Sequence, residues 1–267
     1  MTIRARFVSV VFYVVVSSGT LGCSADGKSA DQEPIDESAL AGDGGDGGPS
    51  AGAKLPLEIQ WFRNSAEYQV MTRVTYRAAA QALDAQLLLR KDTSAWGVVL
   101  DIDETTLDNS TYQKERALQG LGFSPDSWNE WVNRKAAPAV PGAKEFVSHV
   151  RAVGGKVVFV TNRDQPGCAP TEQNLRAVGM VYDAILCTPE ASKTDKNPRF
   201  KAVREGTAIA GVPAIDVLAF VGDNIQDFPD TDQSLRLGPE EKFAVFGTKF
   251  FVLPNPMYGS FAKNPPN

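Results

Sequence analysis

Histidine and cysteine are scarce in this chain of 267 residues, which contains one histidine and three cysteines. Zinc is bound in proteins mostly by histidine and cysteine side chains, and the sequence has no Cys-x-x-Cys pair. A zinc centre of the usual kind is therefore not expected. The single histidine, His149, stands in the helical stretch 146–150 without a partner cluster, which favours a surface or packing role over a catalytic one.

An excess of positive charge is also missing. The chain has 27 lysines and arginines against 32 acidic residues, a net charge of −5. Because nucleic-acid polymers are bound chiefly through basic side chains, no such polymer is expected as a partner. The apolar content of 43% and the four tryptophans are enough for a hydrophobic core.

The first 22 residues are typical of a signal peptide. Two arginines precede an almost unbroken apolar run at 7–16, which small residues follow and which is too short to span a bilayer comfortably. The sequence Thr20-Leu21-Gly22-Cys23 resembles a bacterial lipobox, in which Cys23 becomes the lipidated first residue. Thr20 departs from the usual leucine, so an ordinary secretory signal is the alternative.

Both alternatives predict export. A lipid anchor at Cys23 would attach the protein to a membrane of the bacterial cell envelope, and Ser24 after it favours the outer membrane. Residues 23–54 are rich in Gly, Asp and Ser and cannot bury enough apolar surface to offset their ordering entropy. We expect a flexible tether there, ahead of a folded domain at 55–267.

The folded domain alternates helical and strand patterns. Apolar residues recur at three- and four-residue intervals across 58–89, which predicts one long helix or two joined ones. Apolar strands are expected at 98–100, 156–160, 184–186 and 216–221, with helical stretches at 143–152, 171–178 and 200–205. This order predicts an α/β fold with a parallel sheet covered on both faces. Residues 109–138, inserted after the first strand, are a candidate cap that carries Trp128 and Trp131.

Two acids, Asp101 and Asp103, come directly after the first strand. Residues i and i+2 of an extended chain point the same way, and open α/β sheets bind ligands at the carboxyl ends of their strands. Two carboxylates in one small site repel each other, so each tends to acquire a metal ion or a proton. The pair is a candidate nucleophile and general acid, although an isolated Asp-x-Asp fits an acidic turn equally well.

Polar residues also follow the other three strands. They are Thr161 and Asn162, then Lys193, and finally Asp223 and Asp227. The carboxyl ends of parallel strands share one edge of the sheet, so these side chains can converge with the acid pair. A carboxylate can attack phosphorus, carboxylates suit Mg²⁺, and a hydroxyl, an ammonium and backbone N–H groups can stabilise phosphoryl oxygens.

These segments resemble the motifs of the haloacid dehalogenase (HAD) superfamily of phosphohydrolases, in the forms Asp101-x-Asp103-x-Thr105, Thr161, Lys193 and Gly222-Asp223-x-x-x-Asp227. Other stretches are similar to the class B-like bacterial acid phosphatases of the lipoprotein e family, among them Trp128-x-x-Trp131-Val132, Thr161-Asn162-Arg163 and Leu253-Pro254-Asn255-x-x-Tyr258-Gly259. The resemblance spans roughly residues 57–259. It implies a HAD-like Rossmannoid sheet with a small helical cap.

The resemblance also implies roles. Asp101 would be the nucleophile that forms an aspartyl-phosphate, and Asp103 would protonate the leaving oxygen and then activate water. Thr161 and Asn162 would bind the phosphoryl group, whose charge Lys193 would offset. The predicted Mg²⁺ ligands are Asp101, the main-chain carbonyl of Asp103 and Asp223, with Asp227 in support. An acidic pH optimum is expected because Asp103 must carry a proton to act as an acid.

Two assignments rest on looser matches. Lys196 competes with Lys193, but the spacing to Arg199 and Phe200 favours Lys193 and leaves Lys196 as a solvated surface residue. Family members hold the base of nucleoside 5′-monophosphates between aromatic rings. Tyr258, Trp128 and Trp131 are candidates for that contact, and each also fits plain packing.

The sequence therefore predicts an exported, Mg²⁺-dependent acid phosphatase acting on small phosphomonoesters. A phosphotransferase of the same fold and a non-catalytic storage or ligand-capturing surface lipoprotein are the alternatives, and homo-oligomerisation stays open. An oxidising compartment permits a disulfide between Cys168 and Cys187. Spacing alone does not show that their Cα atoms come close enough, so two free thiols are the alternative.

Overall fold

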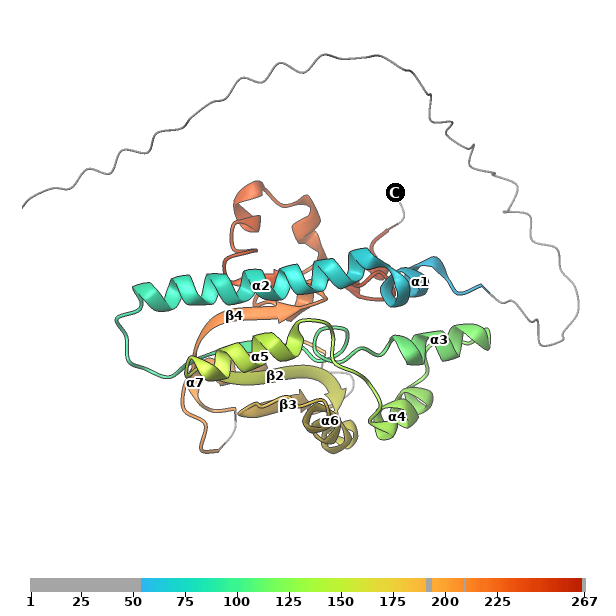
Figure 1. The fold of residues 1–267 in the computed structure, drawn as a ribbon, viewed down its shortest axis with the longest axis horizontal. Helices are drawn as coiled ribbons and strands as arrows, with labels where there is room; N and C mark the ends of the chain where they lie inside the picture. Colours follow the sequence, from blue (N-terminus) through green and yellow to red (C-terminus); the bar gives the residue numbers. More distant parts are fainter. Residues whose placement is uncertain (1–53, 191–193, 209, 266–267) are drawn as a thin grey trace, which may run out of the picture. The chain divides into compact units, whose positions relative to one another are not determined.

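The computed structural model describes residues 54–190, 194–208 and 210–265 (Figure 1). The predicted signal peptide, the lipidation site at Cys23 and the tether up to residue 53 lie outside these ranges. Among the helices within them, none combines the length and the apolar character that crossing a membrane requires.

The helical pattern at 58–89 corresponds to two joined helices, α1 (Leu57–Asn64) and α2 (Ala66–Leu89). The break lies at Ser65, whose backbone is extended and whose hydroxyl accepts a hydrogen bond of 3.1 Å from the backbone N–H of Tyr68. Serine is a favoured N-cap because its oxygen satisfies one of the first N–H groups of a helix. Ser65 therefore ends one helix and begins the next.

Five parallel strands form the sheet, in the order β3-β2-β1-β4-β5. They are β1 (Trp96–Leu100), β2 (Lys156–Asp164), β3 (Ala184–Thr188), β4 (Asp216–Gly222) and β5 (Phe250–Val252). β1 is central, and the chain builds outward from it first on one side and then on the other. Such a reversal of strand order opens a crevice at the carboxyl ends of the central strands.

Helices cover both faces of the sheet, which confirms the predicted fold class. One layer contains α2, α5 (Ala143–Ala152) and α6 (Gln165–Ala177), and the other contains α7 (Asn197–Glu205) with the segment 225–246. Val98 and Leu100 pack into the first layer and Val99 into the second, as alternation along a strand requires. Short 3₁₀ helices complete the chain: η2 (Ile225–Asp227), η3 (Gln233–Leu237), η4 (Glu240–Phe243) and η5 (Ser260–Lys263).

The inserted segment after β1 folds into two helices, α3 (Ser110–Leu118) and α4 (Pro125–Arg134). They lie beyond the ends toward which the arrows of β2 and β4 point (Figure 1). Arg134 donates hydrogen bonds of 2.6 and 2.8 Å to Glu115, which ties the two helices together. The cap thus stands at the edge where the polar strand ends meet.

The second strand and the helix after it differ from the sequence prediction. β2 continues through Thr161, Asn162 and Arg163 to Asp164, and α6 begins at Gln165 rather than at residue 171. Asp164 caps α6 by accepting a hydrogen bond of 3.1 Å from the N–H of Gly167, and Pro166 stands in the first turn, where no N–H is needed. Pro166 therefore stands where a helix tolerates proline, and Pro170 lies inside α6.

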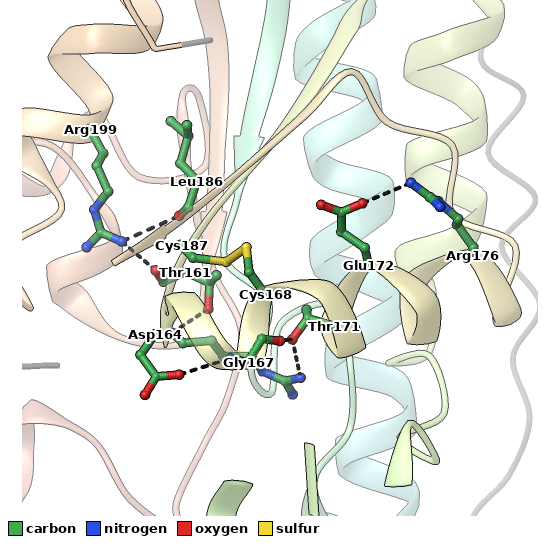
Figure 2. Close-up of a disulfide and its surroundings, with 11 residues drawn as sticks. Thr161, Asp164, Gly167, Cys168, Thr171, Glu172, Arg176, Leu186, Cys187 and Arg199 are labelled. Carbon is green, nitrogen blue, oxygen red and sulfur yellow. Dashed lines mark hydrogen bonds and ion pairs between the residues drawn. A yellow bond between two sulfur atoms is a disulfide. The ribbon is translucent and has the colours of Figure 1, made fainter. Parts of the chain in front are cut away.

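A disulfide joins Cys168 of α6 to Cys187 of β3, with Cα atoms 6.0 Å apart (Figure 2). The structure thereby decides between the two alternatives that the spacing leaves open. The bridge fastens the helix that follows β2 to the neighbouring strand β3.

Replacing both cysteines by serine should lower the free energy of unfolding by about 3 kcal/mol, because the disulfide closes a loop whose ends are 19 residues apart. Urea unfolding monitored by circular dichroism measures the change. Wild-type protein pre-treated with a reductant should unfold at the same urea concentration as the double variant. An unchanged midpoint in both would show that the bridge contributes no stability.

Candidate active site

The loop after β1 is held in one conformation by its own hydrogen bonds. The N–H of Asp101 donates to the carbonyl of Val221 in β4 at 3.0 Å, and the hydroxyl of Thr106 donates to the carbonyl of Asp101 at 2.8 Å. The N–H groups of Thr106 and Leu107 both donate to the carbonyl of Ile102 at 2.8 Å. This turn fixes the direction in which the Asp101 side chain leaves the strand.

Three carboxylates converge at this point. Asp101, Asp223 and Asp227 each offer an oxygen, and the three oxygens lie within 4.8 Å of one another. Asp223 accepts hydrogen bonds from Thr105 at 3.0 Å and from Asn255 at 2.8 Å. The strand β4 and the short helix η2 thus deliver two acids to the end of β1.

Gly222 makes this approach feasible. A Cβ atom at Gly222 would lie 2.3 Å from the Cβ of Asp227, which is far inside van der Waals contact. The carboxylate of Asp227 instead turns back and accepts a hydrogen bond of 2.9 Å from the N–H of Asn224. The Gly-Asp-x-x-x-Asp pattern therefore has a steric reason as well as a chemical one.

Lys196 neutralises part of this negative charge. Its ammonium donates to Oδ1 of Asp101 and, at 2.6 Å, to Oδ1 of Asp227, and the residue is only 3% exposed. The expectation that Lys196 is a solvated surface residue is wrong. Lys196 immediately precedes α7, and the position of that helix brings its side chain under the strand ends. Lys193, which the spacing favours, lies outside the described residues.

Burial and like charges govern the ionisation of the cluster. Burial raises the pKa of Asp101 to about 7, with Lys196 opposing the rise and Asp227 adding to it. Burial also raises the pKa of Asp223 well above its usual value, and the neighbouring Asp227 and Asp101 add to the effect. Burial alone would lower the pKa of Lys196, but Asp101 and Asp227 outweigh it and the pKa is raised. The site is short of positive charge when all three acids are ionised.

The donor set fits a hard divalent cation. Mg²⁺ prefers oxygen ligands and is commonly held by one or two carboxylates together with water, and Asp101, Asp223 and Asp227 supply clustered carboxylate oxygens. Asp103 does not bring its side chain into this cluster. The Asp103 side chain instead lines the cavity next to the three carboxylates.

The side chain of Asp103 faces Arg163 and Asn109. Arg163 donates to Oδ1 of Asp103 from Nε at 3.0 Å and from Nη2 at 2.7 Å, and the amide of Asn109 donates to the same oxygen at 2.9 Å. Asp103 is also one of the residues that line the adjacent cavity. The two acids of the Asp-x-Asp pair therefore have different surroundings, one among acids and one beside a guanidinium.

Arg199 organises the end of β2. Its guanidinium donates to the carbonyl of Thr161 and, at 2.5 Å, to Oδ1 of Asn162 (Figure 2 shows Arg199 beside Thr161). The side-chain oxygen of Asn162 is thus occupied by Arg199, which leaves its N–H groups to be offered elsewhere. Asn162 lines the cavity, whereas Thr161 is fully buried.

A cavity of about 750 Å³ opens over these groups. Asp101, Asp103, Asp223, Asp227 and Lys196 form its polar floor, and its apolar wall includes Phe123, Trp128, Met257 and Tyr258. Of the three predicted substrate contacts, Trp128 and Tyr258 line this cavity. Trp131 does not: it is 2% exposed and donates from Nε1 to Asn109 at 2.8 Å, so the structure removes it from the predicted substrate contacts.

Several residues of the site escape sequence reasoning. Arg163, Asn109 and Arg199 stand within or beside the quoted motifs, but residue type and spacing do not reveal which acid or carbonyl each one contacts. Asn255 stands in the quoted stretch 253–259, but the sequence does not show that its side chain contacts Asp223. His149 pairs with Asp84 at 2.7 Å between α5 and α2, as expected for a histidine without a catalytic role.

The fold and the site together define an α/β protein of the phosphohydrolase type, with paired acids at the end of the central strand. The family model for the HAD superfamily, subfamily IIIB (acid phosphatase), matches residues 51–261. The chain belongs to this family. The resemblance to HAD phosphohydrolases drawn from the motifs is thereby confirmed.

Known relatives agree with this assignment. The chain is similar to the class C acid phosphatase from Bacillus anthracis, solved with tungstate bound, with 28% identity, a TM-score of 0.67, and coverage of 76% of this chain and 84% of that one. It is 29% identical to a stem 31 kDa glycoprotein of Glycine max over 60% of this chain and 58% of that protein. It is 28% identical to acid phosphatase 1 of Solanum lycopersicum over 60% of this chain and 57% of that protein. The matched region is thus less than two thirds of these curated plant relatives.

The raised pKa of Asp101 predicts how stability varies with pH in the metal-free protein. A carboxyl whose pKa rises from 3.8 unfolded to about 7 folded binds its proton more tightly in the folded state. Its contribution is fully present below about pH 4 and is lost as pH rises through about 7. The loss is up to about 4 kcal/mol, because each pH unit corresponds to about 1.4 kcal/mol.

Thermal unfolding in a chelator from pH 4 to pH 8 measures this effect. The Asp101→Asn variant should show a flatter profile, and adding Mg²⁺ should stabilise the wild type more at pH 8 than at pH 5. A variant profile as steep as that of the wild type would assign the pH dependence to other groups.

Proposed function

We propose that this protein is a Mg²⁺-dependent phosphomonoesterase that acts in the bacterial cell envelope. The observation that carries the proposal is the meeting of Asp101, Asp223, Asp227 and Lys196 on the floor of a cavity, with Asp103 beside them. The three acids can hold a cation, and one of them, Asp101, is at the same time the candidate nucleophile. A phosphoryl group is the substrate that uses both.

Each residue has a role that its surroundings support. Asp101 is the nucleophile, since its carboxylate stands at the end of β1 and lines the cavity. Asp103 donates the proton to the leaving oxygen and later takes one from water. Lys196 and Asn162 line the same cavity, and their N–H donors suit the phosphoryl oxygens. Mg²⁺ bound by Asp101, Asp223 and Asp227 would neutralise charge on those oxygens.

The relatives add two supports. The class C acid phosphatase structure contains tungstate, a tetrahedral oxyanion of the shape of phosphate. Acid phosphatase 1 is named for the same reaction. We carry the acid phosphatase activity over to this chain as part of the proposal.

The apolar wall of the cavity indicates the class of substrate. Trp128, Tyr258, Phe123 and Met257 surround the space beside the carboxylates. Flat aromatic groups pack well against such side chains. We infer that the leaving group carries a ring, as a nucleoside 5′-monophosphate does.

The Asp101→Asn variant should fold and lose hydrolysis of p-nitrophenyl phosphate by at least about 10³-fold, because an amide cannot form the acyl phosphate. Steady-state assays from pH 4 to pH 8 measure the loss, with wild-type protein assayed with and without a chelator. Chelation should abolish wild-type activity, and Mg²⁺ should restore it. Retained activity in Asp101→Asn would remove Asp101 as the nucleophile, and added alcohol acceptors would reveal any phosphotransferase product.

Export is supported by the disulfide between Cys168 and Cys187, because such bridges persist in oxidising compartments. The signal at 1–22 and Cys23 then give the route and the membrane anchor. Replacing Cys23 by serine should move the protein from the detergent phase to the aqueous phase in a Triton X-114 partition of a bacterial host. Both forms keep the folded domain, so phosphatase activity reports the distribution. Equal partition of the two forms would rule out the lipid anchor at Cys23.

A further inference from the structure

We propose that Arg163 and Asn109 are positioning residues for Asp103. They hold Oδ1 of Asp103 in place, so that Oδ2 alone exchanges the proton with the leaving group and with water. The proposal rests on the proposed function, since it assigns the atom through which the acid of that reaction works. The cap and α6 take part indirectly, because their side chains contact Asn109 and Arg163.

The hydrogen bonds at Asp103 are one-sided. Arg163 contacts Oδ1 twice, at 3.0 and 2.7 Å, and Asn109 contacts it at 2.9 Å. Within the described ranges every hydrogen bond that the Asp103 side chain accepts ends on Oδ1. The residue lines the cavity and its side chain is 20% exposed, so Oδ2 is the oxygen that remains for a substrate.

Arg163 is itself restrained by Thr171 and Trp128, in addition to its contact with Asp103. Its side chain is 2% exposed, its Nη1 donates to the hydroxyl of Thr171 at 2.9 Å, and the ring of Trp128 lies 5.4 Å from its Cζ. Thr171 belongs to α6, the helix that the Cys168 disulfide fastens to β3 (Figure 2). A guanidinium restrained in this way can hold a carboxylate in one orientation.

Asn109 is restrained by the cap. Its Oδ1 accepts hydrogen bonds from Nε1 of Trp131 at 2.8 Å and from Nη2 of Arg163 at 3.1 Å. These two donors settle which end of the amide is oxygen, and the Nδ2 group must therefore face Asp103. Trp128 and Trp131, three residues apart on α4, thus support the two groups that hold the acid.

The chemistry requires such an arrangement. In the first step a carboxylate oxygen of Asp101 bonds to phosphorus, the bond from phosphorus to the leaving oxygen breaks, and that oxygen takes the proton from Oδ2 of Asp103. In the second step water bonds to phosphorus, gives its proton to Oδ2, and the acyl phosphate bond breaks to regenerate Asp101. One oxygen serves both steps, so a rotation of the Asp103 carboxyl would disrupt both.

A general structural role and a positioning role predict different kinetics for Arg163→Met. A poor leaving group needs the proton and a good one does not, so kcat/KM should fall by about 10²-fold or more for phenyl phosphate and by less than about threefold for 2,4-dinitrophenyl phosphate. Since water activation also fails, dinitrophenyl phosphate should give a burst of product close to one equivalent of enzyme. Stopped-flow assays record both.

Matched variants complete the test. Arg163→Lys should recover part of the loss, and Thr171→Val should show a smaller loss with the same dependence on the leaving group. Arg151→Met removes a different ion pair, the one with Asp183, and should leave both ratios unchanged. If Arg163→Met does not fold, the comparison is made on Thr171→Val and Asn109→Ala.

The outcomes separate the two proposals. A wild-type enzyme inactive on both esters overturns the proposed function and this inference together. An active wild type with equal losses on both esters in the variants, or with no burst, overturns the positioning role alone.

Discussion

The crowding of negative charge at the end of β1 is the constraint on which the rest of the site depends. Asp101, Asp223 and Asp227 place carboxylate oxygens within 4.8 Å of one another, and Asp101 and Asp227 are buried. Buried like charges are unfavourable unless they are paired, protonated or bound to a cation. One buried ammonium, that of Lys196, offsets only part of that charge. The fold thus holds together a set of acids whose charge the proposed cation would offset.

Several residues in the surrounding elements hold the acids in this arrangement. Gly222 lets Asp227 approach, and Ser65 caps α2, the helix that packs over the sheet. The hydroxyl of Tyr76 in α2 donates to the carbonyl of Thr105 at 2.6 Å, and the Thr105 hydroxyl reaches Asp223. The hydrogen bond from α2 therefore fixes the loop after β1, and through Thr105 it also helps to hold Asp223.

The sequence predicts the sheet and the strand-end acids well because both depend on local pattern. Continuous apolar runs mark buried parallel strands, and Asp101, Asp103 and Asp223 follow them directly. β5 was not predicted, because three residues carry too little pattern. The interpretation of Lys196 as a solvated surface residue is wrong, because spacing does not show that the start of α7 brings its side chain to the carboxylates.

The same limit applies to residues whose partners are distant in sequence. Trp131 looks like a substrate contact by residue type, yet its side chain is buried within the cap and donates to Asn109. Arg163 follows Thr161 in a segment predicted to bind phosphate, but it contacts Asp103, 60 residues away. Such choices depend on how the cap and α6 dock, which is a property of packing rather than of any single segment.

Glu104 is a further buried acid beside this site. Its backbone is left-handed, with φ of 55°, and its side chain is buried, so burial together with Asp103 and Asp223 raises its pKa well above the usual value. It accepts hydrogen bonds from the N–H of Asn109 at 2.7 Å and from the hydroxyl of Tyr258. Through its contact with Tyr258, Glu104 ties the C-terminal segment to the loop after β1. Because the Tyr258 hydroxyl is occupied there, its ring is what this residue offers to the cavity.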